Sequence, residues 1–200
     1  MTELGVFGGT FDPPHLGHLA AAQEACSVAR LERVLFVPAG RNPLKPRAPA
    51  STVEHRLAMT ELAVADNPVF VVSRVDADRA GPSYSVDLLE RLRAEQGPGC
   101  QLVFIVGMDV LHELHRWHRP ERLLELASLV AVTRPGQSAL EAGDLEARLP
   151  GATGRITVVR TAGVAISSRE LRARVRTGRP IRYLVPDPVA AYIAEHRLYL

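Results

Sequence analysis

Residues Val6–His18 read VFGGTFDPPHLGH, and this stretch decides the fold of the chain. A short apolar strand runs into Gly8 and Gly9, which carry no Cβ and therefore allow the backbone to approach a ligand closely. The DPP sequence that follows disfavours helical geometry at the two residues that each precede a proline. A helix is therefore expected to begin near Pro14 or His15.

This start places His15 and His18 on one side of the first helical turn. Backbone N–H groups that have no partner within the helix lie there, together with the positive end of the helix dipole. Small residues, a helix start and two imidazoles together describe a cradle for phosphate. Two alternatives remain open, namely zinc ligands or core histidines bonded to the backbone, although the nearby sequence offers no third zinc ligand.

The composition indicates one globular domain. The chain has 200 residues, of which 46% are hydrophobic and 23% are charged. No apolar run approaches the roughly 20 residues that span a membrane, and a strand is expected within a few residues of Met1, which argues against a signal peptide. Cys26 and Cys100 form no C-x-x-C pair, so we expect buried thiols in a reducing cytoplasm.

The net charge of +2 says little about partners, but its distribution is uneven. Six arginines crowd one C-terminal stretch: Arg169, Arg172, Arg174, Arg176, Arg179 and Arg182. Such a stretch is either a local anion-binding surface or a solvated basic helix face. The chain as a whole is not typical of a nucleic-acid-binding protein.

Short apolar segments alternate with helical patterns along the chain, which predicts an α/β fold with a doubly wound parallel sheet. The expected strands are Leu4–Phe7, Arg33–Val37, Val69–Ser73, Leu102–Val106, Leu129–Thr133 and Ile156–Val159. We expect a single domain over residues 1–200, with a Rossmann-like core over 1–160 and a C-terminal helical segment over 161–200.

Helices are predicted between these strands by spacing and by capping signals. Leu19, Ala22, Cys26 and Ala29 mark the first, a Ser51–Glu54 capping box opens the second, and Leu88, Leu89 and Leu92 mark the third. A fourth is expected over Pro120–Ala127, and Asp187-Pro188 should cap a last helix with Val189 and Ile193 facing inward.

Ligands of such sheets bind outside the carboxyl ends of the strands. The loops expected there are Gly8–His18, Pro38–Pro49, Gly107–Asp109, Arg134–Gly136 and Gly163–Arg172. The candidate site is therefore predicted at this edge of the sheet.

The segment AISSRELRARV, which begins at Ala165, contains a second capping box, Ser167 with Glu170. A cap alone does not explain Arg169 in the first turn, where the helix dipole disfavours a cation. Arg172 lies on the same face one turn later. These cations indicate a bound anion, and pairing with Glu170 or exposure to water is the alternative.

The segment FIVGMD ends a buried strand at Gly107 and Asp109. A carboxylate at this position can accept hydrogen bonds from both ribose hydroxyls, or it can simply cap the next helix. Because the G-x-G-x-x-G fingerprint is absent, an ordinary dehydrogenase is disfavoured. Trp117 is either a core residue or a stacking face beside a cleft, and neighbouring His112, His115 and His118 fan out too widely for a metal site.

Together GGTFDPPHLGH, SYSVD, FIVGMD, the RPG at Arg134 and ISSRELR closely resemble the nicotinate-nucleotide adenylyltransferases. These belong to the nucleotidyltransferase superfamily marked by an H-x-G-H motif. The resemblance covers nearly the whole chain, including IRYLVPDPVAAYI near its end. It implies a Rossmann-like fold and transfer of the adenylyl group of ATP to nicotinate mononucleotide.

The resemblance also implies roles for individual residues. The catalytic group would be His15, His18 and Arg172. ATP would contact Gly8, Gly9, Thr10, Phe11, His18, Gly107, Asp109, Ile166, Ser167, Ser168, Arg169 and Arg172. The mononucleotide would contact Asp12, Lys45, Tyr84, Ser85, Trp117 and Arg134. Mg²⁺ would arrive with ATP and take no protein side chain as a ligand.

The sequence departs from the family pattern at four points. Pro14 stands where Ile is usual and Ser85 where Thr is common, and neither change removes a needed group. Arg169 replaces the usual Thr after the two serines, and the NPLKP loop lacks the His that commonly precedes Lys45.

Other functions predict other partners. A sister transferase would use nicotinamide mononucleotide or pantetheine phosphate as acceptor, and a nucleotide sensor would keep the fold without the chemistry. RNA binding through the C-terminal arginines is disfavoured because aromatic residues make up only 5% of the chain. The expected partners are therefore ATP and nicotinate mononucleotide, without nucleic acid or membrane.

Overall fold

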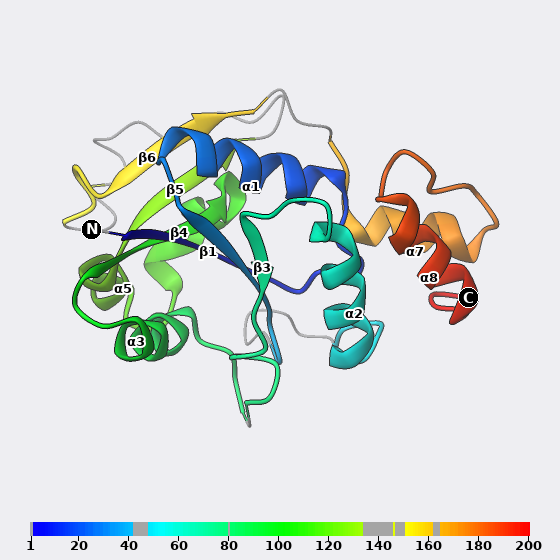
Figure 1. Ribbon diagram of the computed structural model, residues 1–200, viewed down its shortest axis with the longest axis horizontal. Coiled ribbons are helices and arrows are strands. Elements are labelled where there is room, and N and C mark those ends of the chain that lie inside the picture. Colours follow the sequence, from blue (N-terminus) through cyan, green and yellow to red (C-terminus); the bar gives the residue numbers. More distant parts are fainter. Residues whose placement is uncertain (1, 42–47, 80, 134–145, 147–150, 162–164) are drawn as a thin grey trace.

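The computed structural model describes residues 2–41, 48–79, 81–133, 146, 151–161 and 165–200. Six parallel strands form one sheet in the order β3-β2-β1-β4-β5-β6 (Figure 1). The strands are β1 (Thr2–Gly9), β2 (Arg33–Pro38), β3 (Phe70–Val72), β4 (Cys100–Gly107), β5 (Ala127–Thr133) and β6 (Ile156–Arg160). All six strands predicted from the sequence are confirmed, and each differs from the prediction by no more than two residues at either end.

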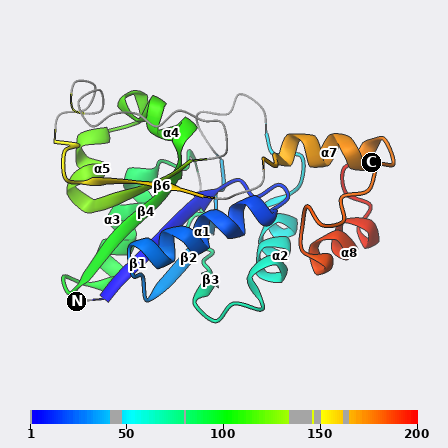
Figure 2. The ribbon, with the colours of Figure 1, turned by 90° about the horizontal axis from the view of Figure 1, so that it is seen from above.

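Helices connect the strands and cover both faces of the sheet, which confirms the doubly wound α/β prediction. They are α1 (Leu16–Val28), α2 (Val53–Val64), α3 (Ser85–Gln96), α4 (Met108–Glu113), α5 (Pro120–Leu126), α7 (Ser168–Arg176) and α8 (Asp187–Glu195), with a 3-10 turn, η1 (Leu114–Arg116), after α4. Figures 1 and 2 show α1 on one face of the sheet and α3 with α5 on the other.

Each face of the sheet carries its own apolar cluster because side chains alternate along a strand. Val6 and Phe104 pack with α3, α4 and α5, whereas Phe7 and Ile105, one residue further along β1 and β4, pack with α1. The uniformly apolar strands are therefore buried on both faces, as their composition predicts.

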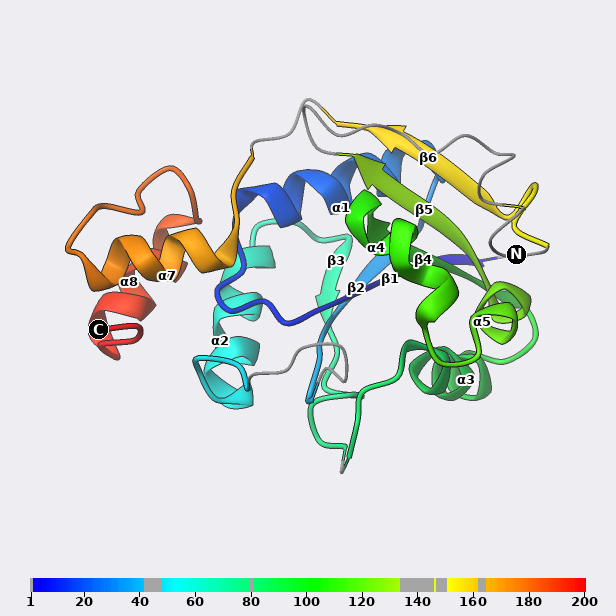
Figure 3. The ribbon, with the colours of Figure 1, turned by 180° about the vertical axis from the view of Figure 1, so that it is seen from behind.

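A third cluster joins the C-terminal helices to α2. Met59 and Ala63 of α2 pack against Leu171 of α7 and against Val189 and Ile193 of α8. Figure 3 shows α7 and α8 together beside α2, at the end of the molecule away from α3 and α5. The prediction that Val189 and Ile193 face inward is confirmed, since they are 0% and 3% exposed.

Two helix starts differ slightly from the sequence predictions. The N-cap of α2 is Thr52, whose Oγ1 accepts a hydrogen bond from the His55 N–H at 3.4 Å. The predicted cap, Ser51, is wrong by one residue, because its hydroxyl instead donates to Asp12. The α8 helix includes Asp187, and its N-cap is the preceding Pro186. No helix in the described parts of the chain is long and apolar enough to span a membrane.

Candidate active site

A cavity of about 310 Å³ opens at the carboxyl edge of the sheet, where the order of the parallel strands changes direction between β1 and β4. This switch point is where open parallel sheets bind their ligands. Ten residues predicted for the site line this cavity: Gly8, Gly9, Thr10, Phe11, His18, Tyr84, Ser85, Gly107, Asp109 and Trp117. The structure thus brings together segments that lie as much as a hundred residues apart in the sequence.

The structure gives the two glycines of β1 different roles. A Cβ on Gly8 would lie 3.7 Å from the Phe104 ring, which is ordinary contact, so the glycine leaves open space in the cavity wall. A Cβ on Gly9 would lie 2.8 Å from Cζ of Phe11. At Gly9 the missing Cβ therefore makes room for the Phe11 ring, and a contact between Gly9 and a ligand stays a prediction.

Phe11 forms the floor beneath the histidine motif. Its backbone has a φ of 49°, in the left-handed region, and the residue is 2% exposed. Its ring centroid lies 5.1 Å from that of His18 and 5.6 Å from those of Phe7 and Phe36. The aromatic rings thus support one side of the His18 imidazole.

His15 and His18 lie together at the start of α1, as the sequence predicts. His15 is the N-cap, and its ring stacks on that of His18 with centroids 3.6 Å apart. The His15 backbone N–H donates to Nδ1 of His18 at 3.2 Å. Because Nδ1 accepts this bond, the proton of the neutral His18 ring lies on Nε2. His15 itself is 2% exposed and is not among the residues that line the cavity.

Gly107 and Asp109 lie at the end of β4, on the cavity wall. Gly107 is the N-cap of α4, and Asp109 lies within the first turn of that helix. Of the two readings left open by the sequence, the N-cap role for Asp109 is therefore wrong. A carboxylate at this edge, beside the open space at Gly107, is suited to accept ribose hydroxyls.

Aromatic rings and hydroxyls also line the cavity. Trp117 packs edge-on against Phe104 with ring centroids 6.2 Å apart, and Tyr84 lies 4.5 Å from the ring of His118. Ser85 begins α3 next to Tyr84. Trp117 therefore serves as a partly buried core residue and as part of the cavity wall at once.

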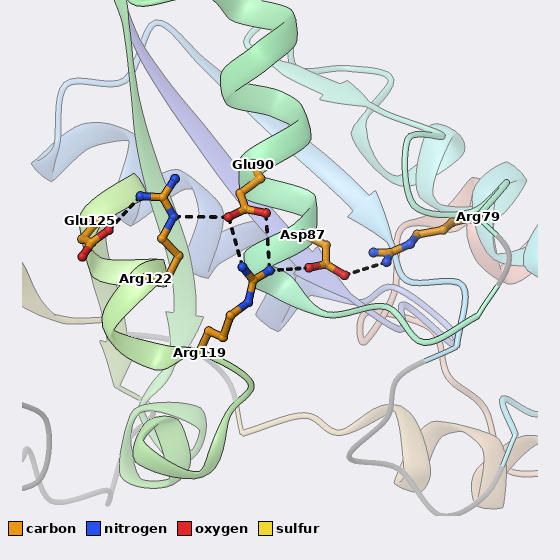
Figure 4. Close-up of polar contacts among 6 residues, drawn as sticks. All are labelled: Arg79, Asp87, Glu90, Arg119, Arg122 and Glu125. Atoms are coloured by element: carbon orange, nitrogen blue, oxygen red, sulfur yellow. Dashed lines mark hydrogen bonds and ion pairs between the residues drawn. The ribbon is translucent and has the colours of Figure 1, made fainter.

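Ion pairs join the first turns of α3 to Arg119, just before α5 (Figure 4). Asp87, two residues after Ser85, accepts from Arg79 at 2.6 Å and from Arg119 at 2.9 Å. Arg119 lies two residues after Trp117. Burial raises the pKa of Asp87, but the hydrogen bonds and charges of the two arginines outweigh it and lower the pKa below its usual value.

The same network continues outward from α3 to α5. Glu90 accepts from Arg119 at 3.4 Å and from Arg122 at 3.2 Å, and Arg122 also pairs with Glu125 at 2.7 Å. These outer side chains are exposed by about a third or more, so they add little stability individually. The partly buried Asp87 is the residue on which the junction depends.

Asp12 differs from its predicted role as a mononucleotide contact. It is 3% exposed and is not among the residues that line the cavity. Its Oδ2 accepts from the Ala50 N–H at 2.6 Å, and its Oδ1 accepts from the hydroxyls of Ser51 at 2.5 Å and Tyr199 at 2.8 Å. The donors to this carboxylate are therefore groups of the protein itself.

The start of α7 lies against the motif loop rather than in the cavity wall. Ser167 is the N-cap and accepts from the Glu170 N–H at 3.2 Å, which confirms the predicted cap. Ser168 donates to the Pro13 carbonyl at 2.9 Å, and Arg172 donates through Nη1 to the Asp12 carbonyl at 2.6 Å.

Other residues predicted for the site have different positions. Ile166 is buried in the C-terminal cluster, and Arg169 is exposed. Lys45 and Arg134 lie outside the described residues, as do three of the loop regions expected at the site: part of 38–49, all of 134–136 and the start of 163–172. Within the described ranges, no group of three or more His, Cys, Asp or Glu side chains could hold a metal ion.

Sequence reasoning missed three residues near the site. Arg56 of α2 is 1% exposed and donates to the carbonyls of Thr10 at 2.8 Å and Gly40 at 3.5 Å. Burial lowers the pKa of Arg56, against the charges of Asp12 and Asp76. Asp76 is 4% exposed and lines the cavity. The third residue is Tyr199, whose hydroxyl donates to Asp12. In the sequence, nothing distinguishes Arg56 and Asp76 from surface charges or Tyr199 from a core aromatic residue.

Comparisons with known proteins agree with this geometry. A family model described as cytidylyltransferase-like matches residues 6–174. A relative from Symbiobacterium thermophilum, named "Probable nicotinate-nucleotide adenylyltransferase", is 47% identical over 100% of this chain and 96% of its own length. A relative of the same name from Thermomicrobium roseum is 46% identical over 100% of this chain and 92% of its own.

Solved structures share the fold. A Plasmodium falciparum nicotinic acid mononucleotide adenylyltransferase complexed with NaAD superposes with a TM-score of 0.79, at 16% identity, over 100% of this chain and 98% of that one. At this identity the likeness shows the fold, whereas the sequence relatives show the family. The chain therefore belongs to the cytidylyltransferase-like family and, within it, to the nicotinate-nucleotide adenylyltransferases.

Proposed function

We propose that this protein transfers the adenylyl group of ATP to nicotinate mononucleotide, producing nicotinate adenine dinucleotide and pyrophosphate. One observation carries the proposal. A single cavity at the switch point has a carboxylate beside an open glycine in one part, aromatic rings and hydroxyls in another, and the His18 ring in its wall. Two nucleotides that must react with each other would meet at this histidine.

The reaction needs positioning and charge stabilisation more than proton transfer. The phosphate of the mononucleotide, already ionised at neutral pH, attacks the α-phosphorus of ATP in line. A new P–O bond forms as the bond to the leaving pyrophosphate breaks. No general base is required, so catalysis rests on holding two anions together and neutralising the charge that develops.

His18 is the group best placed to stabilise that charge. Its Nδ1 is occupied by the His15 N–H, so Nε2 carries the proton that can be donated to a phosphate oxygen. The stacked His15 ring fixes the orientation of His18. A direct contact between His15 and phosphate stays a prediction from the sequence.

ATP is proposed to lie along β1 and the end of β4. Gly8, Thr10 and the loop after them would border its phosphates, with Gly107 and Asp109 at the ribose. Arg172 donates one N–H to the protein backbone and has further N–H groups, since a guanidinium carries five. We propose that these, with Ile166, Ser167, Ser168 and Arg169 of the C-terminal segment, complete the triphosphate site.

The mononucleotide is proposed to occupy the part lined by Tyr84, Ser85 and Trp117. The indole offers a face for the nicotinate ring, and the hydroxyls offer hydrogen bonds to its carboxylate. Lys45 and Arg134 are proposed to bind the phosphate and carboxylate of this substrate, on the resemblance of the sequence alone.

Mg²⁺ is proposed to enter as part of the ATP substrate. The ion keeps several waters and binds phosphate oxygens in preference to an all-protein cage. A cytoplasmic location is also proposed, because Cys26 and Cys100 are both free and buried. Burial raises the pKa of both thiols, which keeps them protonated and unreactive.

The test is pyrophosphate release from ATP and Mg²⁺ with nicotinate mononucleotide, run beside nicotinamide mononucleotide and pantetheine phosphate. We expect release with the acid mononucleotide and little with the other acceptors. Comparable rates with the amide would require a dual-specificity pocket. No release with any acceptor, from folded protein that still binds ATP, would contradict the proposal and favour a nucleotide sensor.

A further inference from the structure

Side chains from distant parts of the chain hold the loop between β1 and α1. Three of its carbonyls accept side-chain hydrogen bonds: Thr10 from Arg56 at 2.8 Å, Asp12 from Arg172 at 2.6 Å, and Pro13 from Ser168 at 2.9 Å. These donors belong to α2 and α7. The loop that leads to the histidine motif is thus shaped largely by tertiary contacts.

The Asp12 carboxylate is the most heavily bonded group of the loop. At 3% exposure it is removed from water, which is costly unless its oxygens accept hydrogen bonds. Three donors satisfy them, two of which, the hydroxyls of Ser51 and Tyr199, share Oδ1. Hydrogen bonds to a charged group of this kind are stronger than those between neutral groups.

Tyr199 reaches this carboxylate from the segment that follows α8. Its hydroxyl donates to Asp12 Oδ1 at 2.8 Å and lies 3.8 Å from the Met59 sulfur of α2. Burial, together with the charge of Asp12, raises the pKa of the Tyr199 hydroxyl far above its usual value. The hydroxyl therefore stays protonated and remains a donor over the whole physiological pH range.

The chain between Asp12 and His15 is stiff. It consists of Pro13 and Pro14, whose rings fix φ near −65°. A displacement of Asp12 is therefore passed toward His15 without relief from rotation about φ at either proline. His15 in turn holds His18 through ring stacking and through its backbone N–H.

We propose that Tyr199 is a positioning residue for His18, acting through Asp12 and the two prolines. This inference rests on the proposed adenylyl transfer, because it concerns the placement of the group that stabilises charge in that reaction. Tyr199 touches neither substrate in this proposal, and its hydroxyl fixes the carboxylate that sets the position of the motif.

The test compares Tyr199→Phe with Tyr183→Phe. Tyr183 also lies in the C-terminal segment with a left-handed φ, 63° against 68° for Tyr199, but it is 76% exposed. Both changes remove only a hydroxyl. We expect Tyr199→Phe to lower kcat roughly tenfold, as for the loss of one charge-assisted hydrogen bond, while the KM values for both substrates change by less than about twofold. Tyr183→Phe should behave as wild type.

A double-mutant cycle with His18→Ala separates positioning from general stability. If Tyr199 acts by placing His18, then Tyr199→Phe should lower the residual kcat of His18→Ala by less than about twofold. Ser51→Ala, which removes the other donor to Oδ1, should show the same dependence on His18. The Ser51→Ala variant replaces Tyr199→Phe in this test if Tyr199→Phe does not fold.

Two outcomes would overturn the inference while leaving the proposed function intact. One is a Tyr199→Phe enzyme with wild-type kcat. The other is a tenfold loss that persists undiminished in the His18→Ala background. Wild-type protein that releases no pyrophosphate would instead overturn the proposed function, and this inference with it.

Discussion

Substituting Gly9 by Ala tests whether the aromatic floor under the histidine motif is as rigid as the structure indicates. The added Cβ would lie 2.8, 2.9 and 3.1 Å from three atoms of the Phe11 ring, against about 3.5–4.0 Å for favourable carbon contacts. Rings of Phe7, His18 and Phe36 surround Phe11, so it cannot simply move aside.

We expect Gly9→Ala to destabilise the fold by about 1–3 kcal/mol, the usual range for overpacking in a filled core. For a chain of this length each kcal/mol corresponds to roughly 2–4 °C in Tm. The melting temperature should therefore fall by roughly 2–12 °C. Turnover should fall as well, measured below the new Tm, because the displaced Phe11 ring pushes on His18.

Gly8→Ala is the matched control for stability. Its Cβ would lie 3.7 Å from Phe104, so its Tm should equal or slightly exceed that of wild type. The cost of Gly9→Ala should also shrink in a Phe11→Leu background, where the crowded ring is absent. Equal melting temperatures for the two alanine variants, or a cost that Phe11→Leu leaves unchanged, would refute the reasoning.

Three further changes test the site. His18→Ala should lower kcat by roughly 10²–10³, the usual loss for one preorganised donor, and normal pyrophosphate release from a folded variant would contradict its role. Gly107→Ala should leave Tm unchanged, since φ is −76° and its Cβ would meet no atom within 4 Å, but should raise the KM for ATP; an unchanged KM would argue against ATP at this wall. Asp87→Asn should cost about 1–2 kcal/mol in urea unfolding at neutral pH. Because Arg79 and Arg119 lower its pKa, that stability is present above the ordinary value of 3.8 and is lost as pH falls through the lowered pKa, so a cost that does not shrink as the pH is lowered below 3.8 would contradict the assignment.

The sequence predicts well what depends on local chemistry. The β4 strand is apolar apart from Gln101 and is bounded by glycine, so its position follows from the local composition. The start of α1 follows from two prolines, and the cap at Ser167 follows from its hydroxyl and Glu170. These features depend on neighbours within a few residues, which the sequence displays directly.

Contacts between distant segments could not be predicted in the same way. Ser51 has the sequence pattern of a cap, but the buried carboxylate of Asp12 takes its hydroxyl and leaves the cap to Thr52. Gly9 and Phe11 are only two residues apart, yet the left-handed backbone of Phe11 that brings its ring against Gly9 cannot be recognised from the residue types. In both cases the outcome depends on the folded geometry and not on the local pattern alone.

The side chains that hold the loop between β1 and α1 also determine when this protein can become functional during its synthesis. The loop at Asp12 and Pro13 is held by residues that follow it by 155 to 187 positions. A ribosome-bound chain can form β1, α1 and their neighbours early, since domains begin to fold from the N-terminal side. The histidines stay poorly fixed until Ser168, Arg172 and Tyr199 have left the ribosome. Incomplete chains should therefore lack the ordered motif, because contacts from near the end of the chain hold its first loop in a single shape.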